Sequence, residues 1–160
     1  MKELTTIGVY GTDLDGFLGE LRRANVLLLL DLREKRGVRG HEYAWANAQR
    51  LQRALEDAGI EYRHHKELAP TTELRHLQYA EDERLGVGKR SRDTLAAAYV
   101  ERYEREILDR VDLGPIVAEM PDGAATALFC VERDPAACHR SLVAERMARE
   151  LGLPVRHLLP

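Results

Sequence analysis

The residues of this chain that could do chemistry gather near its C-terminal end. The chain has only two cysteines, Cys130 and Cys138, and the second is followed directly by His139 and Arg140. Glu132 lies two positions after the first cysteine. Thiol, imidazole, carboxyl and guanidinium groups could together supply a nucleophile, an acid or base, and an anion-binding group. We therefore take this segment as the first candidate for a functional site.

The local sequence predicts that Cys138 lies at the start of a helix. Asp134 and Pro135 are typical of a helix cap and first turn, which places Cys138 in that turn. Unpaired backbone N–H groups and the helix dipole favour negative charge there, so Cys138 should hold a thiolate more readily than an ordinary cysteine. The same helix start could bind a phosphate or carboxylate, with Arg140 as donor and His139 as a group that titrates near neutral pH.

Plainer interpretations stay open for both cysteines. Each could fill the core as a small apolar residue, Cys130 in particular because it ends a buried strand. A zinc site made of Cys130, Cys138, His139 and a distant histidine is a third interpretation, but the spacing matches no standard ligand pair and we predict no metal ligand. A disulfide is disfavoured because two cysteines in a chain without an apolar leader indicate the reducing cytoplasm.

Alternating strands and helices must position these residues. Apolar and β-branched runs predict strands over residues 4–10, 26–30, 60–64, 126–131 and 154–158. Helical spacing predicts helices between residues 13 and 25, over 45–58, over 91–108 with Ser91 as cap, and from Asp134 to Gly152. Residues 67–91, with their Pro, Thr and Gly, are predicted to form a long loop with at most a helical turn. This order predicts a three-layer α/β sandwich, with a mostly parallel open sheet of about five strands and helices on both faces.

The carboxyl edge of such a sheet is where ligands bind. We expect Asp31 and Arg33, which follow the second strand, to meet Cys130 and Glu132, which follow the fourth. A carboxylate at the tip of an apolar strand is costly unless it is paired, so Asp31 needs a partner such as Arg33 or a ligand donor.

Two basic segments lead from the same edge. They contain Arg33, Lys35, Arg36, Arg39 and His41 in the first segment and Lys89, Arg90 and Arg92 in the second. Such segments could bind phosphate or nucleic acid, and they are also common as merely solvated surface.

Length and composition predict one globular domain over residues 1–160. Hydrophobic residues make up 44% of the chain and charged residues 32%. The net charge of -3 gives no overall attraction to nucleic acid, although local basic clusters could still bind an anion. The longest apolar run, Val26–Leu30, is too short to cross a bilayer, so no membrane partner is expected.

Several segments together resemble the domain-of-unknown-function 488 family. They are Thr6-Ile7-Gly8, Leu30-Asp31-Leu32-Arg33, Phe129-Cys130-Val131-Glu132, Asp134-Pro135, Cys138-His139-Arg140 and Val155-Arg156-His157-Leu158. The most specific part is the pattern C-x-E-x-D-P-x-x-C-H-R. The resemblance implies an α/β sandwich and no established reaction. The resemblance also implies that the site shared by the family is formed here by Asp31, Arg33, Cys130, Glu132, Cys138, His139 and Arg140. The chain departs from the family at Tyr10, where members often have His, and at Ala69-Pro70, where they often have Gly-Gly.

Three functional hypotheses follow. The first is an enzyme that acts on a phosphorylated or otherwise anionic small molecule or nucleotide, with Cys138 as nucleophile or redox thiol and His139 as acid or base. In it, Cys130 and Glu132 complete the catalytic group, and Asp31, Arg33, Arg36 and Arg140 bind the ligand. The second is a noncatalytic module that binds nucleic acid or a nucleotide through the basic segments. The third is a regulatory protein that senses a ligand or redox state. The sequence identifies no cofactor.

Overall fold

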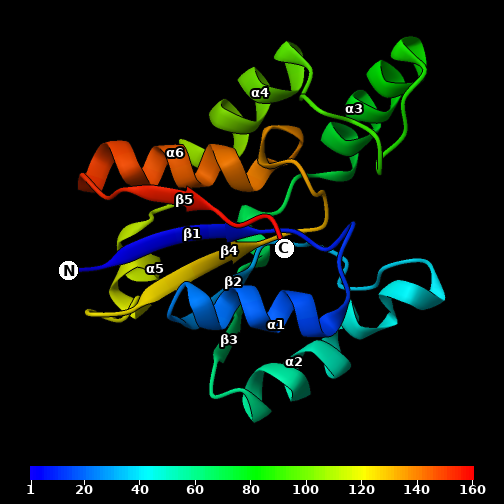
Figure 1. The fold of residues 1–160 in the computed structure, drawn as a ribbon. Helices are drawn as coiled ribbons and strands as arrows, with labels where there is room; N and C mark the ends of the chain where they lie inside the picture. Colours follow the sequence, from blue (N-terminus) through cyan, green and yellow to red (C-terminus); the bar gives the residue numbers. More distant parts are fainter.

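The computed structural model describes residues 1–160 as a five-stranded, all-parallel sheet covered by helices (Figure 1). The strands are β1 (Glu3–Ile7), β2 (Val26–Asp31), β3 (Glu61–His64), β4 (Ala125–Phe129) and β5 (Val155–His157). The α-helices are α1 (Leu14–Arg23), α2 (Ala48–Asp57), α3 (Thr72–Leu85), α4 (Ala97–Tyr103), α5 (Gly114–Glu119) and α6 (His139–Leu151). Short 3-10 turns cover His41–Ala46, Lys66–Leu68 and Pro135–Ala137, and a π-helical turn over Glu104–Leu108 continues α4.

The strand order β3-β2-β4-β1-β5 creates a crevice at one edge of the sheet. The connections after β1 and β2 run through α1 and α2, whereas the connection after β4 runs through α6 in the opposite direction. Chain segments that leave neighbouring strands in opposite directions leave room between them at the carboxyl edge. Ile7 of β1 and Asp31 of β2 both pair with Phe129 of β4, so the three strands end at the same level.

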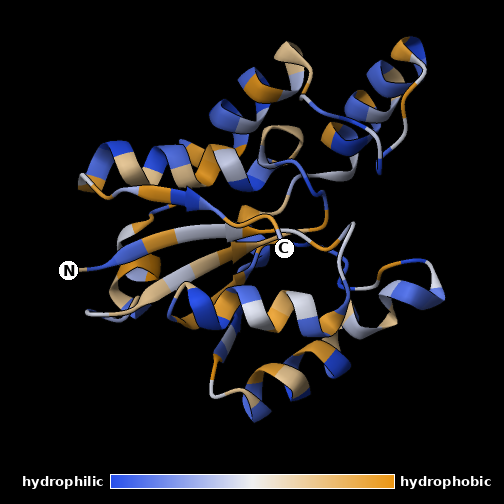
Figure 2. Cartoon of the chain, in the orientation of Figure 1, coloured by the Kyte–Doolittle hydropathy of each residue, from blue (hydrophilic) through white to orange (hydrophobic).

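Two hydrophobic layers hold the helices on the sheet. Phe17 and Leu21 of α1 and Leu51 and Leu55 of α2 pack in one buried cluster with Leu29 and Phe129 of the sheet. The second cluster joins Leu28, Leu30 and Leu128 to Leu74 of α3, Tyr103 of α4, Ile116 of α5 and Met147 of α6. Figure 2 shows hydrophobic residues concentrated in the strands and alternating with hydrophilic ones along the helices. The predicted three-layer sandwich is therefore confirmed.

The prediction of a long loop over residues 67–91 is wrong, because most of it is helix α3. The buried positions of α3 are Leu74, Gln78 and Asp82, which are four residues apart but mostly polar. Hydrophobic spacing therefore could not reveal this helix. Its ends were visible, since the Thr71 side chain accepts from the Leu74 N–H and Gly86 ends the helix in the left-handed conformation.

Other boundaries also differ from the prediction. The helix expected from Ser91 begins at Ala97, because Ser91 lies in a turn where its hydroxyl contacts the Gly88 N–H. The short helix α5 was not predicted. Asp134 caps the 3-10 turn Pro135–Ala137 rather than the last helix, which begins at His139. Cys138 consequently lies just before the first turn of α6, with extended backbone.

Candidate functional site

A cavity of about 910 Å³ opens at the carboxyl edge of the sheet. Its floor is formed by residues that follow β4 and begin α6, and its walls by the segments after β1 and β2, by α3 and by residues 88–92. Pockets for small ligands usually lie in this size range. Seven of the lining residues are Lys or Arg and two are Glu: Arg33, Lys35, Arg39, Arg75, Lys89, Arg90 and Arg92, and Glu34 and Glu132.

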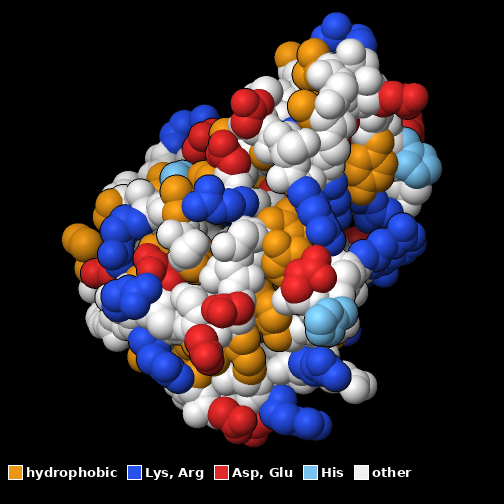
Figure 3. All heavy atoms as spheres, turned by 45° about the vertical axis from the view of Figure 1, so that its right-hand side comes forward, with side chains coloured by type: hydrophobic (Ala, Val, Ile, Leu, Met, Phe, Trp, Pro, Cys, Tyr) orange, Lys and Arg blue, Asp and Glu red, His pale blue; other side chains and the backbone are white.

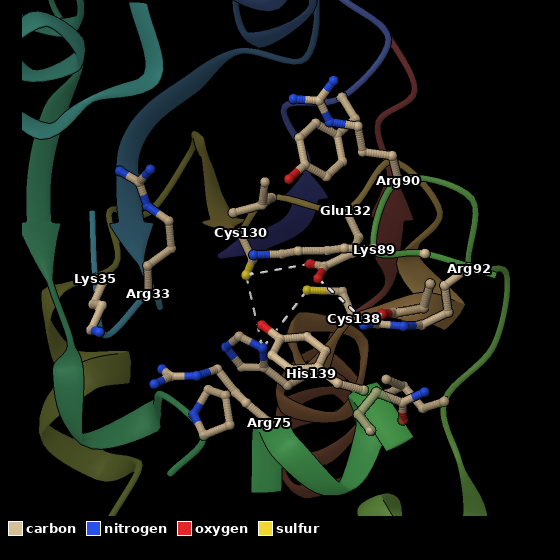
Figure 4. A pocket seen from close by; sticks show the side chains of 18 of the residues that line it. Arg33, Lys35, Arg75, Lys89, Arg90, Arg92, Cys130, Glu132, Cys138 and His139 are labelled. Atoms are coloured by element: carbon tan, nitrogen blue, oxygen red, sulfur yellow. Dashed lines mark hydrogen bonds and ion pairs between the residues drawn. The ribbon is translucent and has the colours of Figure 1, made fainter. Parts of the chain in front are cut away.

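Four chemically active side chains meet at the floor. The His139 Nδ1 atom lies 3.8 Å from the Cys130 sulfur and 3.8 Å from the Cys138 sulfur. The Cys130 sulfur lies 3.8 Å from Oε2 of Glu132. In Figure 4 both sulfur atoms and the His139 ring face one another beneath the open side of the cavity. The predicted grouping of Cys130, Glu132, Cys138 and His139 is therefore present in the structure.

The orientation of His139 is fixed from two sides. Its Nε2 atom lies 3.1 Å from the Leu32 carbonyl oxygen, which can only accept, so Nε2 must carry a proton. The Tyr103 ring packs against the imidazole with ring centres 5.6 Å apart. Because Nε2 is held in this way, Nδ1 is the atom that exchanges a proton with the two sulfurs.

The two thiols differ in acidity although both are buried. Burial opposes ionisation of Cys138, but the Cys130 thiol and the positive charges of His139 and Arg140 outweigh it and hold the pKa of Cys138 well below its ordinary value. The neighbouring Cys138 sulfur and burial raise the pKa of Cys130 well above the ordinary value. Burial lowers the pKa of His139, but the charge on Cys138 outweighs that effect and leaves it raised. A Cys138 thiolate paired with a His139 imidazolium is the state that these shifts favour.

Glu132 is the second group that titrates near neutral pH. Burial, and then the negative charge of Cys138, raise its pKa to about 7 against the opposing charges of Lys89 and Arg92. Arg92 Nη1 lies 3.3 Å from Glu132 Oε1, and Asp82 holds the other side of the same guanidinium through Nε and Nη2. A carboxyl group in this range can donate or accept a proton at pH 7.

The backbone at Gly8 and the backbone at Glu132 approach each other very closely behind the cysteine–histidine cluster. A Cβ atom at Gly8 would lie only 2.0 Å from the Glu132 carbonyl oxygen, so only glycine fits there. Two nitrogens of Arg140 donate to the carbonyl oxygens of Glu132 and Arg133, at 2.5 and 3.1 Å. These contacts tie the segment after β4 to β1 and α6 and thereby fix the position of the cluster.

The mouth of the cavity carries exposed basic side chains. Lys35 and Arg39 come from the segment after β2, and Lys89 and Arg90 from the segment after α3. Figure 3 shows Lys and Arg side chains gathered on this side of the molecule, next to the lobe that α3 and α4 form. Figure 4 shows the Lys89 side chain reaching across the cavity toward Cys130. Partial burial opposes the charge of Lys89, but the negative charge of Glu132 and weaker contributions from neighbouring tyrosines outweigh it and raise its pKa.

The Arg90 guanidinium makes cation–π contacts with two tyrosine rings at the rim of the cavity. It lies 5.2 Å from the centre of the Tyr10 ring and 5.1 Å from the centre of the Tyr43 ring. It also donates to the Arg39 carbonyl oxygen at 3.0 Å. These contacts hold residues 88–92 against the segments that follow β1 and β2.

Asp31 is paired with Arg33, which lines one side of the cavity. Arg33 Nε and Nη2 donate to the two Asp31 oxygens at 2.9 and 2.8 Å, and Nη1 donates to the Ala46 carbonyl oxygen. The Tyr62 hydroxyl donates to the same carboxylate at 2.6 Å. The expected partner of Asp31 is thus Arg33, whose guanidinium points away from the cysteines in Figure 4. Three of the five guanidinium N–H groups of Arg33 are bound in this way and the residue is only 3% exposed, which disfavours the anion-binding role that the sequence suggested.

Arg36 and Arg140 also lie elsewhere than a ligand-binding role requires. Neither lines the cavity. Arg36 donates to the Tyr62 hydroxyl at 3.2 Å, and Arg140 is fully buried behind the floor, where its Nε atom has no partner. The basic residues that line the mouth of the cavity are therefore Lys35, Arg39, Lys89 and Arg90, and not these two arginines.

Three cavity residues had no part in the catalytic site expected from the sequence: Arg75, Tyr99 and Lys89. Arg75 was hidden within the unrecognised helix α3, although its position four residues after the cap Thr71 could have placed it. Tyr99, within the helix predicted over residues 91–108, stacks on Tyr103 and also reaches the cavity. Lys89 was considered only for the binding-module hypothesis; no local signal distinguishes it from a solvated lysine.

The cluster also contains a set of metal-binding atoms. The sulfurs of Cys130 and Cys138 and one ring nitrogen of His139 all lie within 4.8 Å of one another. Two thiolates and an imidazole are ligands that zinc accepts, and the cavity side of the set would leave a fourth position open. The set of three residues differs from the zinc interpretation of the sequence, which required a distant histidine.

The fold and the site define a class: an α/β sandwich with a Cys-His-Glu cluster in the crevice at the carboxyl edge of its parallel sheet. Comparison with known families adds one result. The profile described as domain of unknown function DUF488 matches residues 13–147, and the chain belongs to this family. The resemblance seen in the sequence is thereby confirmed.

Two further comparisons gave no match. No curated protein and no solved structure is significantly similar to the chain. None of its helices combines the length and the apolarity that crossing a bilayer requires.

Proposed function

We propose that this protein is a cytoplasmic enzyme that acts on a small anionic substrate, a phosphorylated compound or a nucleotide, with Cys138 as its nucleophile. One observation carries the proposal: at the floor of a cavity whose mouth is lined by lysine and arginine, Cys138 contacts His139, and Cys130 contacts both His139 and Glu132. A nucleophile next to a base, in a pocket that attracts the substrate's charge, is the arrangement that covalent catalysis requires.

The residues of the floor would divide the chemistry between them. The Cys138 thiolate forms a bond to an electrophilic atom of the substrate, and His139 stabilises the thiolate before the attack. Glu132 gives its proton to the group that leaves and recovers it from water. Cys130 lies within reach of the same histidine and bounds the space around the reacting atom.

The basic mouth supports an anionic substrate. Lys35, Arg39, Lys89 and Arg90 are exposed and come from two segments that face each other across the opening. A cavity lined by one sign of charge concentrates ligands of the opposite sign. The volume of about 910 Å³ is sufficient for a nucleotide-sized ligand.

Alkylation of Cys138 as a function of pH tests the proposal. The rate of modification by iodoacetamide, followed by mass spectrometry, should show a midpoint well below the value of about 8.5 for a free cysteine. Cys138→Ser should abolish this fast reaction, whereas Cys130→Ser should preserve it. A Cys138 that reacts no faster than a free cysteine at each pH would refute the nucleophile.

A noncatalytic module is separated from the enzyme by a binding assay. A module that holds nucleic acid through the basic mouth would lose affinity steeply with salt and would bind equally well after Cys138→Ser. The enzyme instead should bind inorganic phosphate or a nucleotide in the cavity, and covalent modification of Cys138 by a bulky reagent should block that binding.

A further inference from the structure

We propose that Cys130 and Cys138 form a dithiol pair that reduces a small anionic disulfide, with Cys138 as the attacking thiol and Cys130 as the resolving thiol. The inference rests on the proposed role of Cys138 as nucleophile and adds a second function for Cys130. Catalytic disulfides that form transiently are compatible with a reducing compartment, where structural disulfides are rare.

The placement of the two sulfurs carries the inference. Both cysteines are free, and both sulfurs contact the same nitrogen, Nδ1 of His139, at 3.8 Å. The sulfurs lie within 4.8 Å of each other, so a bond of about 2.05 Å requires an approach of less than about 3 Å. They come from different elements, one from the end of β4 and one from the start of α6, so each can shift without unwinding a helix.

The first step joins the substrate to the protein. The Cys138 thiolate attacks one sulfur of the substrate disulfide, a Cys138–substrate disulfide forms, and the substrate's own S–S bond breaks. The departing thiolate takes up the proton that His139 carried on Nδ1, next to the Cys138 sulfur, and the imidazole is left neutral. One thiol product is released at this point.

The second step releases the other half of the substrate. Because the imidazole is neutral after the first step, its Nδ1 atom, 3.8 Å from the Cys130 sulfur, is free to accept a proton. It accepts the proton of Cys130, whose sulfur attacks the Cys138 sulfur. The Cys130–Cys138 bond forms, the mixed disulfide breaks, and the second departing thiolate takes the proton from Nδ1 of His139. The substrate gains two electrons, the protein dithiol loses two, and a small dithiol from solution restores the reduced protein.

The acidity of the two thiols fits these separate roles. A thiol that attacks first must be ionised, and burial and the neighbouring sulfur keep Cys130 protonated until Cys138 has reacted. This difference agrees with Cys138 as the thiol that attacks first and Cys130 as the thiol that resolves the mixed disulfide.

The shape and charge of the cavity set the substrate class. Cys138 is 2% exposed and Cys130 is 6% exposed, at the floor of the cavity, so a disulfide within a folded protein could not reach either sulfur. The lysines and arginines at the mouth favour a molecule with carboxylate or phosphate groups. A small disulfide that carries negative charge satisfies both conditions.

Glutathione disulfide is a suitable probe of this class, and the products can be counted by mass spectrometry. The reduced wild-type protein should end with an intramolecular Cys130–Cys138 disulfide and should release two equivalents of glutathione. Cys130→Ser should stop at a glutathione adduct on Cys138 and release one equivalent. Cys138→Ser should not react at a comparable rate. Circular dichroism and thermal unfolding confirm that each variant is folded.

A neutral disulfide of similar or smaller size, hydroxyethyl disulfide, serves as the control for charge. It should react with the wild-type protein about tenfold more slowly than glutathione disulfide at low salt. Lys89→Ala should slow the reaction of the anionic probe more than that of the neutral one.

Several results would overturn the dithiol pair. A stable glutathione adduct in the wild-type protein, with no intramolecular disulfide, would show that Cys130 does not resolve. Zinc bound tightly through both thiols, which protected them from the probe in the protein as purified, would also overturn it. If Cys138 still showed its fast alkylation in those cases, only the dithiol pair would be refuted, and Cys138 would remain the proposed nucleophile. If the fast alkylation were absent as well, both proposals would be refuted.

Discussion

Two sets of basic side chains surround the same strand ends, and they differ in what they bind. Arg33, Arg92 and Arg140 are buried and donate to Asp31, to Asp82 and Glu132, and to backbone carbonyls. Lys35, Arg39, Lys89 and Arg90 are exposed at the cavity mouth. We call the first three the inner arginines and the last four the outer basic residues.

The difference shows which charges belong to the fold and which are available to a ligand. A buried guanidinium is tolerated only when protein acceptors replace the water that it has lost. Arg33 and Arg92 meet this condition through carboxylates and backbone carbonyls, and Arg140 meets it through its two terminal nitrogens, while its Nε atom has no partner. The outer basic residues keep contact with solvent and can exchange it for an anion at lower cost.

The largest effect expected is on stability, from an inner arginine. Arg33→Met leaves the buried carboxylate of Asp31 without its ion pair and should lower the free energy of unfolding by about 3–5 kcal/mol. Denaturant titration measures this loss. The double variant Asp31→Leu with Arg33→Met should recover much of it, because no unpaired charge remains. A single variant as stable as the wild type would place Arg33 among the residues available to a ligand.

The next effect concerns Glu132, which the inner Arg92 holds at the floor. Its pKa in the folded protein, about 7, is above the unfolded value, so folding favours the protonated carboxyl. This contribution to stability is complete below the unfolded pKa and is lost as pH rises through 7, by roughly 3 kcal/mol. Glu132→Gln should remove that loss and should become more stable than the wild type at pH 8. Parallel stability curves from pH 4 to pH 8 would contradict the raised pKa.

A smaller effect is expected from an outer residue, and on binding alone. Lys89→Ala should weaken the binding of a nucleotide or inorganic phosphate about tenfold, which corresponds to about 1.4 kcal/mol. The free energy of unfolding should change by less than about 0.5 kcal/mol. Calorimetric titration compares the variant with Lys66→Ala, which removes an exposed lysine outside the cavity. Equal affinities for the two variants would show that the outer basic residues do not form the binding surface.

The fold could be predicted from the sequence where the burial is apolar. Val26–Leu30 and the run before Cys130 are buried strands, and their apolar character follows from helices on both faces of the sheet. Helix α3 could not be predicted because its buried stripe includes Gln78 and Asp82, whose partners are the Ala96 N–H and Arg92. Those partners lie ten or more residues away, so the local sequence does not show that Gln78 and Asp82 are paired and buried.

The location of the candidate site could be predicted, but the sequence could not show which arginines bind protein acceptors and which face the cavity. Strand ends brought Cys130 and Glu132 to the same edge as Asp31 and Arg33, and the structure places them there. Whether an arginine binds a ligand or a carbonyl oxygen depends on what faces it in three dimensions. The acceptors for Arg140 are the backbone oxygens of residues 132 and 133. Every residue has a backbone oxygen, so the residue types in the sequence could not identify these two as acceptors.

The central claim, a reactive Cys138 inside a positive cavity, is tested most directly with two alkylating reagents that differ in charge. In the Cys130→Ser variant, where Cys138 is the only thiol, iodoacetate should react faster than iodoacetamide at low salt, because the outer basic residues attract the carboxylate. High salt, or Lys89→Ala, should remove the preference. A Cys138 that reacts more slowly with iodoacetate at every salt concentration, as expected when a thiolate repels an anion without nearby positive charge, would contradict the claim.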